Sequence, residues 1–231
     1  MNGDDLKRAR LEMKQTQQHA ARHLGVSQGY LSLLENGRRA VPGSLVHRLL
    51  AEYDVPPTSL PLRSPENQSL GTRVEAWALG LGALGYPGFS YTNAKARPDR
   101  NPADFLLDAL MQPDLDSRVA KGLPWLAFQY PAMNWDWLVR NAKLYDLQNR
   151  LGFVVTLARQ VAERTHAEAK VSQLEKCETL LERSRLVRED TFCHTSLTEV
   201  EKRWLREKRP PEAQHWNLLT DLTAEQLTHA S

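Results

Sequence analysis

The stretch TQQHAARHLGVSQGYLSLLENG, residues 16–37, decides the fold of the N-terminal part of the chain. Two short helical patterns lie on either side of Gly25, a residue that tolerates the positive φ of a tight turn. Thr16 and Ser27 stand just before these patterns, where a side-chain hydroxyl can accept a hydrogen bond from a backbone N–H of the first turn. The stretch therefore predicts two helices, each with its own N-cap, joined by a short turn.

Further helical patterns flank this stretch on both sides. Upstream, Leu6, Arg10 and Met13 recur at a spacing that places them on one face of a helix. Downstream, residues 43–50 repeat leucine at helical spacing, and the prolines at 56–57 end the pattern. The sequence thus predicts a compact unit of four helices over its first sixty or so residues.

The charge of the chain is unevenly distributed. Residues 1–48 carry eight Lys and Arg against four Asp and Glu, whereas the whole chain has 30 against 28 and a net charge of only +2. Each Lys or Arg that contacts a phosphate releases condensed counterions, so a basic segment favours a polyanionic partner. A solvated surface is the alternative that charge alone leaves open.

Residues 16–37 resemble the helix-turn-helix of the Xre/Cro family, which includes the lambdoid phage repressors. Ala21 is small, as required where the two helices cross, and Val26 is the apolar plug that follows the turn. The resemblance extends over residues 4–60 and implies a helix-turn-helix domain that binds double-stranded DNA.

The resemblance also implies an ion pair that joins two helices of the domain. In the lambdoid repressors an arginine of the first helix pairs with the glutamate just before the Asn-Gly turn, and Arg10 and Glu35 occupy those positions here. The alternative is that both are ordinary surface charges.

The second helix of the motif is the expected recognition helix. It begins at Ser27, so the resemblance places Gln28, Gly29, Ser32 and Leu33 toward the bases of the major groove. Gln28 is the sharpest candidate, because a glutamine amide matches the N7 acceptor and N6 donor of adenine. Gly29 contributes no side chain for base reading, which leaves Leu33 to touch a thymine methyl group.

Five residues are expected to contact the DNA backbone. They are Gln17, Ser27, Asn36, Arg38 and Arg39. Gln17 begins the preceding helix, where its own backbone N–H is aligned with the helix dipole. The last three follow the recognition helix and should meet the next phosphates.

The chain departs from the family pattern in two places. Ala20 stands where a large aliphatic residue is usual, and Gln15 stands where an apolar residue precedes the second helix. Met13 or Leu24 could fill the space that Ala20 leaves. Tyr30, on the recognition helix, can either stack on a sugar or pack on the domain.

The rest of the chain is predicted to be helical, which makes the whole protein all-α. We expect a helix-turn-helix domain over residues 1–61, a linker over 62–69 and a helical domain over 70–231, for which a solenoid-like stack is one arrangement. Amphipathic patterns lie at about 102–112, 114–129, 134–148, 150–168, 171–189, 197–208 and 212–228. Strand-like alternation is nearly absent from this region.

The larger domain contains no catalytic or metal-binding signature. We found no phosphate-binding glycine loop, no zinc motif and no nucleophile motif, so we expect no enzymatic activity, no metal and no cofactor. Cys177 and Cys193 are interpreted as reduced thiols. Trp135 and Trp137 cannot share a face, so one should pack inward while the other joins a partner surface or a ligand cleft, with core packing as the alternative for each. The basic half of residues 199–209 suits either the helix dipole or a second nucleic-acid surface.

These features predict a sequence-specific regulator of transcription. One small domain reads a single half-site, so we expect a homodimer. The absence of an apolar span and of a signal peptide predicts a cytoplasmic protein without a membrane segment. Relatives with an appended domain serve as antitoxins or controllers of defence genes, which implies a repressor whose helical domain holds a toxin or another operon product. The alternatives are a DNA-targeted enzyme with an unrecognised active site in the helical domain, and a protein-interaction module that does not bind DNA.

Overall fold

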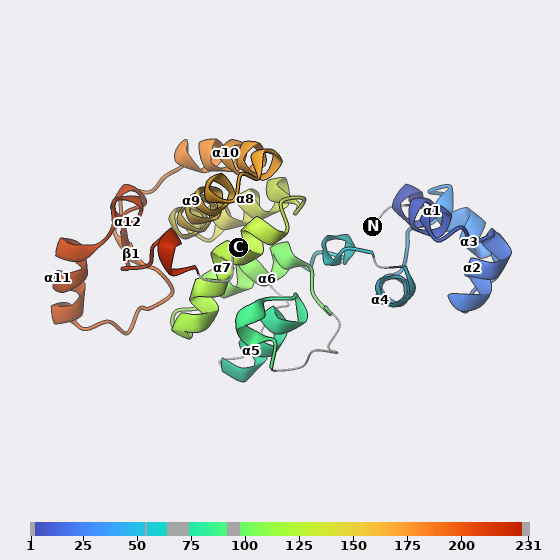
Figure 1. The fold of residues 1–231 in the computed structure, drawn as a ribbon, viewed down its shortest axis with the longest axis horizontal. Coiled ribbons are helices and arrows are strands. Elements are labelled where there is room, and N and C mark those ends of the chain that lie inside the picture. The colour runs from blue at the N-terminus through green and yellow to red at the C-terminus, as the bar shows by residue number, and fades with distance from the viewer. Residues whose placement is uncertain (1–2, 54, 64–73, 92–97, 228–231) are drawn as a thin grey trace. The chain divides into compact units, whose positions relative to one another are not determined.

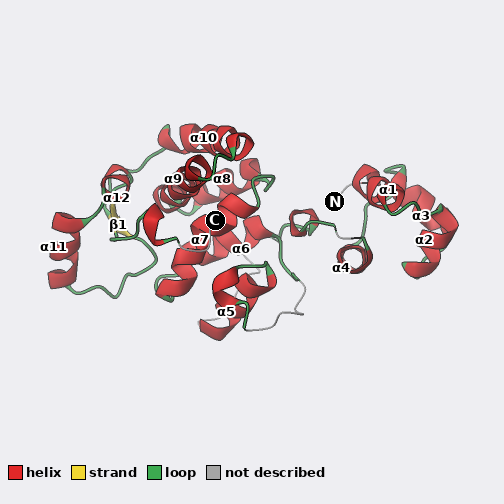
Figure 2. Cartoon of the chain, viewed as in Figure 1, coloured by secondary structure: helices red, strands yellow, loops and turns green. Residues whose placement is uncertain are grey.

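A computed structural model gives the fold of the chain and describes residues 3–53, 55–63, 74–91 and 98–227 (Figure 1). The chain divides into two compact units: residues 1–62 with 97–101, and residues 63–96 with 102–231. Most of the expected linker, from residue 64 onward, lies outside the described residues. Helices dominate both units, which confirms the all-α fold class (Figure 2).

The described part of the first unit consists of four α-helices and a short 3₁₀ turn. These are α1 (Gly3–Glu12), α2 (Gln17–His23), α3 (Gln28–Glu35), α4 (Gly43–Glu52) and the 3₁₀ turn Pro57–Ser59. Their core is a cluster of aliphatic side chains in which Leu6, Leu24, Leu31, Leu34 and Leu49 are fully buried. The four predicted helices are therefore present, and each contributes to one core.

Local hydrogen bonds set the boundaries of α2 and α3. The hydroxyl of Thr16 accepts from the N–H of His19, and that of Ser27 accepts from the N–H of Tyr30, both at 3.2 Å. Between the helices Gly25 has a φ of +64°, a conformation that side chains disfavour. The caps and the glycine turn thus behave as the sequence predicted.

The expected position of Met13 is wrong. Helix α1 ends at Glu12, and Met13 is 50% exposed instead of sharing the buried face of Leu6 and Arg10. Lys14, the next residue, has a φ of +53°, which turns the chain away from the helix. Leu24, the other candidate to fill the space beside Ala20, is fully buried in the same core cluster.

The second unit is built from eight α-helices and a two-stranded pairing within the described residues. The α-helices are α5 (Val74–Ala83), α6 (Pro102–Met111), α7 (Ser117–Gln129), α8 (Trp135–Leu144), α9 (Gln148–Arg164), α10 (Glu168–Glu182), α11 (Glu199–Lys208) and α12 (Pro211–His215). The strands β1 (Asp190–Thr191) and β2 (Leu218–Leu219) pair in parallel, and 3₁₀ turns occupy Pro87–Phe89 and Ala224–Gln226. No helix among the described residues is long and apolar enough to cross a membrane.

Helix α9 lies at the centre of the second unit. Its residues 148–158 are all buried, and it packs against α7, α8, α10 and α12. The buried guanidinium of Arg150 donates to both carboxylate oxygens of Asp190, at 2.8 and 3.1 Å, and to the carbonyl of Leu110 at 2.8 Å. Arg150 therefore joins α6, α9 and β1.

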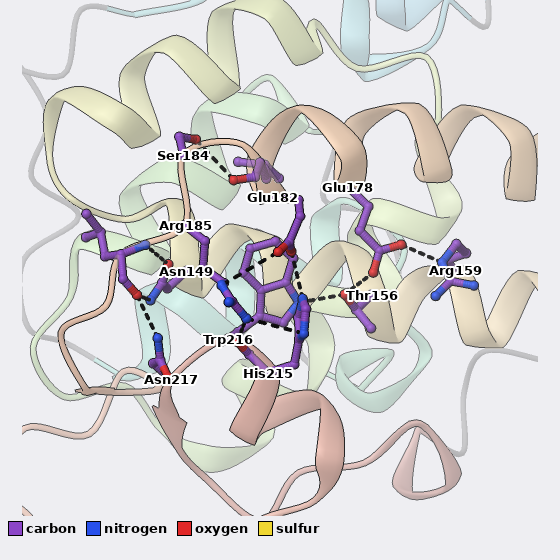
Figure 3. Close-up of polar contacts among 12 residues, drawn as sticks. Asn149, Thr156, Arg159, Glu178, Glu182, Ser184, Arg185, His215, Trp216 and Asn217 are labelled. Atoms are coloured by element: carbon purple, nitrogen blue, oxygen red, sulfur yellow. Dashed lines mark hydrogen bonds and ion pairs between the residues drawn. The ribbon is translucent and has the colours of Figure 1, made fainter.

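Polar side chains connect α9 to the helices on either side of it (Figure 3). The indole N–H of Trp216 donates to the hydroxyl of Thr156 at 2.8 Å, and that hydroxyl donates to Glu178 of α10. Glu178 also accepts from Arg159 at 2.6 Å. Because each of these groups has a partner, the α9–α10–α12 packing contains a satisfied polar layer.

The prediction of one helix over residues 212–228 is wrong. Helix α12 ends at His215, and Asn217 takes a φ of +52°, which directs the chain into β2. The buried indole of Trp216 holds this break in place through its contact with α9. The helix expected over 171–189 likewise ends at Glu182, before the chain extends toward β1.

Candidate nucleic-acid interface

Helix α3 has one buried and one open face. Leu31 and Leu34 are fully buried in the core, whereas Gln28 and Gly29 at the start of the helix are exposed. A Cβ placed on Gly29 would meet no atom within 4 Å. The first turn of α3 is therefore not covered by other parts of this unit, as is required of a helix that enters the major groove of a duplex.

Ser32 and Leu33 follow one turn further along α3 and are half-buried. The hydroxyl of Ser32 lies 3.3 Å from the side-chain nitrogen of Asn36, which also donates to the carbonyl of Ser32 at 2.8 Å. The Asn36 amide nitrogen thus closes the C-terminal end of α3. Because this side chain is exposed, its expected contact with a phosphate stays a prediction.

The end of α3 is fixed to α1 by a buried ion pair. The Nε and Nη2 atoms of Arg10 donate to the two carboxylate oxygens of Glu35 at 2.7 and 2.9 Å. A third guanidinium nitrogen donates to the carbonyl of Gln15 at 2.9 Å. Two parallel bonds give the pair a defined geometry, so α1 and α3 are held at a fixed angle.

The environment of Glu35 keeps its carboxylate charged. Burial opposes ionisation, but hydrogen bonds from Arg10 and Gln17 outweigh it and hold the pKa of Glu35 below its ordinary value. The same pair raises the pKa of Arg10, chiefly through its hydrogen bond to Glu35. A charged pair at neutral pH is therefore part of the domain core.

The side chain of Gln17 makes a bond within the domain. Its amide nitrogen donates to Glu35 at 2.9 Å, as a third bond to that carboxylate. Its backbone N–H lies in the first turn of α2, where no intrahelical acceptor exists. This N–H is the group expected to meet a phosphate, and that contact stays a prediction. The hydroxyl of Ser27 accepts the capping bond of α3, so its own hydrogen can still be donated to a phosphate.

Two exposed cations follow the C-terminal end of the motif. Arg38 and Arg39 follow α3 and are both exposed, with the Arg39 guanidinium 5.6 Å from the centre of the Tyr30 ring. Tyr30 itself packs against the core cluster, so its ring supports the arginine from the side of the domain. Both arginines can reach a phosphate without leaving a buried partner.

Sequence reasoning missed one cation at the turn. Arg48 of α4 donates to the carbonyl of Leu24 at 2.9 Å, directly beneath the Gly25 turn. Its spacing from the motif gives no signal, because the contact joins residues 24 positions apart. Gln15, the other departure from the family pattern, accepts from the hydroxyl of Tyr53 at 2.8 Å.

The second unit holds few candidates for chemistry. Trp135 is buried and Trp137 is partly exposed. Burial raises the pKa of both Cys177 and Cys193 to about 12, so both are inert thiols at neutral pH. Within the described residues, no three His, Cys, Asp or Glu side chains are grouped so that they could hold a metal ion.

The basic half of α11 is occupied by ion pairs within the unit. Arg206 and Arg209 contact Glu189 at 2.8 and 3.4 Å, and Lys202 contacts Glu199 at 2.8 Å. These pairs leave less free positive charge for a second nucleic-acid surface than the sequence suggested.

A cavity of about 320 Å³ lies between α7, α11 and β2. Leu115, Phe192 and Leu219 contribute apolar surface to its lining, and Lys121 and His194 contribute polar groups. Its volume lies at the lower end of the range of small-molecule sites.

The geometry of the first unit is that of a helix-turn-helix domain: a capped helix, a glycine turn and a second helix with one face open. Residues 3–62 match the family model described as a helix-turn-helix domain, consistent with the Xre-type resemblance. The match does not extend into the second unit. Comparisons with curated proteins and with solved structures found no match. Domains of this class typically bind DNA in regulators and are not enzymes.

Proposed function

We propose that the protein is a sequence-specific regulator of transcription that reads the major groove of double-stranded DNA with the start of α3. The observation that carries this proposal is the exposure of Gln28 and the open space at Gly29 on a helix whose other face is fully buried. Gln28 reads an adenine, while Ser32 and Leu33 contact the next bases along the groove.

The charges around α3 support DNA over a protein partner. Arg22, Arg38, Arg39 and Arg48 are exposed in the same unit. A domain that used the fold only for protein contacts would lack this set of phosphate-directed cations. In this proposal Arg38 and Arg39 bind phosphates beside α3. Backbone N–H groups at the start of α2 bind phosphates on the opposite side of the motif.

A binding experiment tests both kinds of contact. Duplexes selected by the full chain from a random pool serve as the probe, and binding is measured by fluorescence anisotropy at several salt concentrations. We expect Gln28→Ala to lower discrimination at one base pair by about 1–3 kcal/mol. We expect Arg39→Ala to weaken binding to all duplexes and to reduce the salt slope by about one.

Matched variants in the second unit serve as controls. Gln129→Ala and Arg188→Ala remove an exposed amide and an exposed cation far along the chain from the motif. Both should leave discrimination and salt slope unchanged. Failure of the selection to enrich any sequence, or equal effects of the motif and control variants, would disprove the proposed interface.

We also propose that the protein acts as a homodimeric repressor. Two recognition helices must meet half-sites about 34 Å apart on one face of the duplex to bind a site tightly. The second unit then provides self-association and the binding of a toxin, another operon product or a small effector, and its cavity supports the last of these. Light scattering coupled to gel filtration tests the dimer, and the identity of the neighbouring gene separates an antitoxin from a simple repressor.

A further inference from the structure

Two histidines lie side by side on the exposed surface of α2. His19 and His23 are four residues apart, and both are exposed. Their ring centroids are 4.3 Å apart, with an angle of 66° between the ring planes. Residues at this spacing lie on one face of a helix, one turn apart.

The separation of the rings suits a shared metal ion. With a metal–nitrogen distance of about 2.0–2.1 Å, two imidazoles on one ion have centroids roughly 4.5–5 Å apart. The observed 4.3 Å is only slightly shorter, so small side-chain rotations would open the pair around an ion. The helix backbone already holds the two histidines one turn apart, so binding of an ion requires little further ordering of the chain.

One hydrogen bond orients the His23 ring for this role. Its Nδ1 atom lies 3.2 Å from the backbone carbonyl oxygen of His19, which can only accept. Nδ1 therefore carries the proton in this contact, and the lone pair of the neutral ring is on Nε2. A ring held through Nδ1–H to a carbonyl is the usual arrangement of a metal-binding histidine.

We propose that His19 and His23 form an open, two-histidine site for a borderline divalent transition-metal ion: Zn²⁺, Ni²⁺ or Cu²⁺. Imidazole nitrogens favour these ions over Mg²⁺ and Ca²⁺, which prefer oxygen ligands. The described residues offer no group of three metal-binding side chains, so water completes the coordination. The exposed cation of Arg22, between the two histidines in sequence, lowers the affinity of the site.

The ion would stabilise the helix-turn-helix unit. It binds two side chains that are adjacent only when α2 is helical, so it favours the folded state over the unfolded chain. Helix α2 precedes the Gly25 turn and α3, so the ion strengthens the part of the motif that supports the recognition helix. The site does not depend on the proposed DNA contacts and can be tested without DNA.

The experiment uses the full chain, with Cu²⁺ as a spectroscopic probe and Zn²⁺ for titration calorimetry. We expect one site per chain, two coordinated nitrogens in the electron paramagnetic resonance spectrum of the Cu²⁺ form, and an increase in the melting temperature with Zn²⁺. His19→Asn and His23→Asn should each weaken binding by about tenfold or more. His166→Asn removes a single exposed histidine of the second unit and is the matched control.

The outcomes separate the proposal from nonspecific binding. Loss of affinity in both α2 variants, with retention in His166→Asn, would support it. Equal affinity in all variants, or a single coordinated nitrogen in the unaltered chain, would overturn it. The number of coordinated nitrogens is measured on the unaltered chain, so this test remains valid even where a variant folds poorly.

Discussion

The indole ring of Trp216 lies against the backbone of Gly152. A Cβ built on Gly152 would fall 2.4 Å from two carbons of that ring, closer than side chains pack. The two residues are 64 positions apart, and Trp216 is fully buried. This contact fixes the C-terminal segment on the central helix α9, and it has a testable consequence.

We expect Gly152→Ala to destabilise the second unit by about 1–3 kcal/mol, because the added methyl group overpacks the site. Urea unfolding followed by circular dichroism measures the change. Trp216→Leu should relieve the clash, so the double variant should lose less stability than the sum of the two single variants. Additive losses would show that the ring does not restrict position 152.

The Arg10–Glu35 pair predicts a strong asymmetry between single and double variants. Arg10→Met leaves the Glu35 carboxylate buried without its main partner, which should destabilise the first unit by about 3–5 kcal/mol. Arg10→Met combined with Glu35→Leu removes both charges and should recover most of that loss. Hydrogen exchange of α1 and α3 amides measures both. A double variant as unstable as Arg10→Met would contradict this account.

The lowered pKa of Glu35 predicts acid sensitivity of the first unit. A carboxyl whose pKa is lower in the folded state adds stability that is fully present above its unfolded value, taken as 4.5, and is lost as pH falls through the folded pKa. Stability from this group should therefore be constant near neutral pH and fall below about pH 4.5. Thermal unfolding of Glu35→Gln over the same pH range provides the comparison, and the stability of this variant should change less with pH.

Gly29 offers a stabilising substitution at the proposed interface. Because a Cβ there meets no atom within 4 Å, Gly29→Ala should stabilise α3 by about 0.5–1 kcal/mol through helix propensity. Gly25→Ala is the matched control, since a φ of +64° disfavours a side chain and the change should destabilise. A loss of stability in Gly29→Ala would show that the helix is not open at this point.

The cysteines should be unreactive in the folded protein. Burial raises the pKa of Cys177 and Cys193 to about 12, so the thiolate is scarce at neutral pH. We expect no reaction with a thiol-specific chromophore until denaturant is added. After denaturation, two equivalents of the reagent should react per chain. Rapid labelling of either residue without denaturant would show that the structure around it opens readily.

Much of the helix-turn-helix unit could be predicted because its signals are local. The hydroxyl caps of Thr16 and Ser27 bond to N–H groups three residues away, and the Gly25 turn depends on one φ angle. The expected positions of Gln28 and Gly29 follow from helical spacing once Leu31 is taken as buried. Their roles in base reading, and those of Arg38 and Arg39 at phosphates, stay predictions until DNA binding is measured.

The helix wrongly expected over 212–228 has its cause in a contact between distant parts of the chain. Periodicity over 212–228 is real, but a buried Trp216 and the left-handed Asn217 divide the segment into a short helix, a strand and a 3₁₀ turn. The bond from the Gln17 amide to Glu35, 18 positions away, is likewise a contact that no local pattern predicts.

The sequence by itself determined the caps of α2 and α3 and the turn between them, because capping, turn formation and apolar spacing involve groups within one or two turns. Only the tertiary structure decided which polar groups far apart in the sequence bind one another, as with Gln17 and Glu35, and which segments stop being helical. Those outcomes depend on the burial of groups brought together by folding, and burial gives unpaired polar atoms a free-energy penalty that no local pattern records.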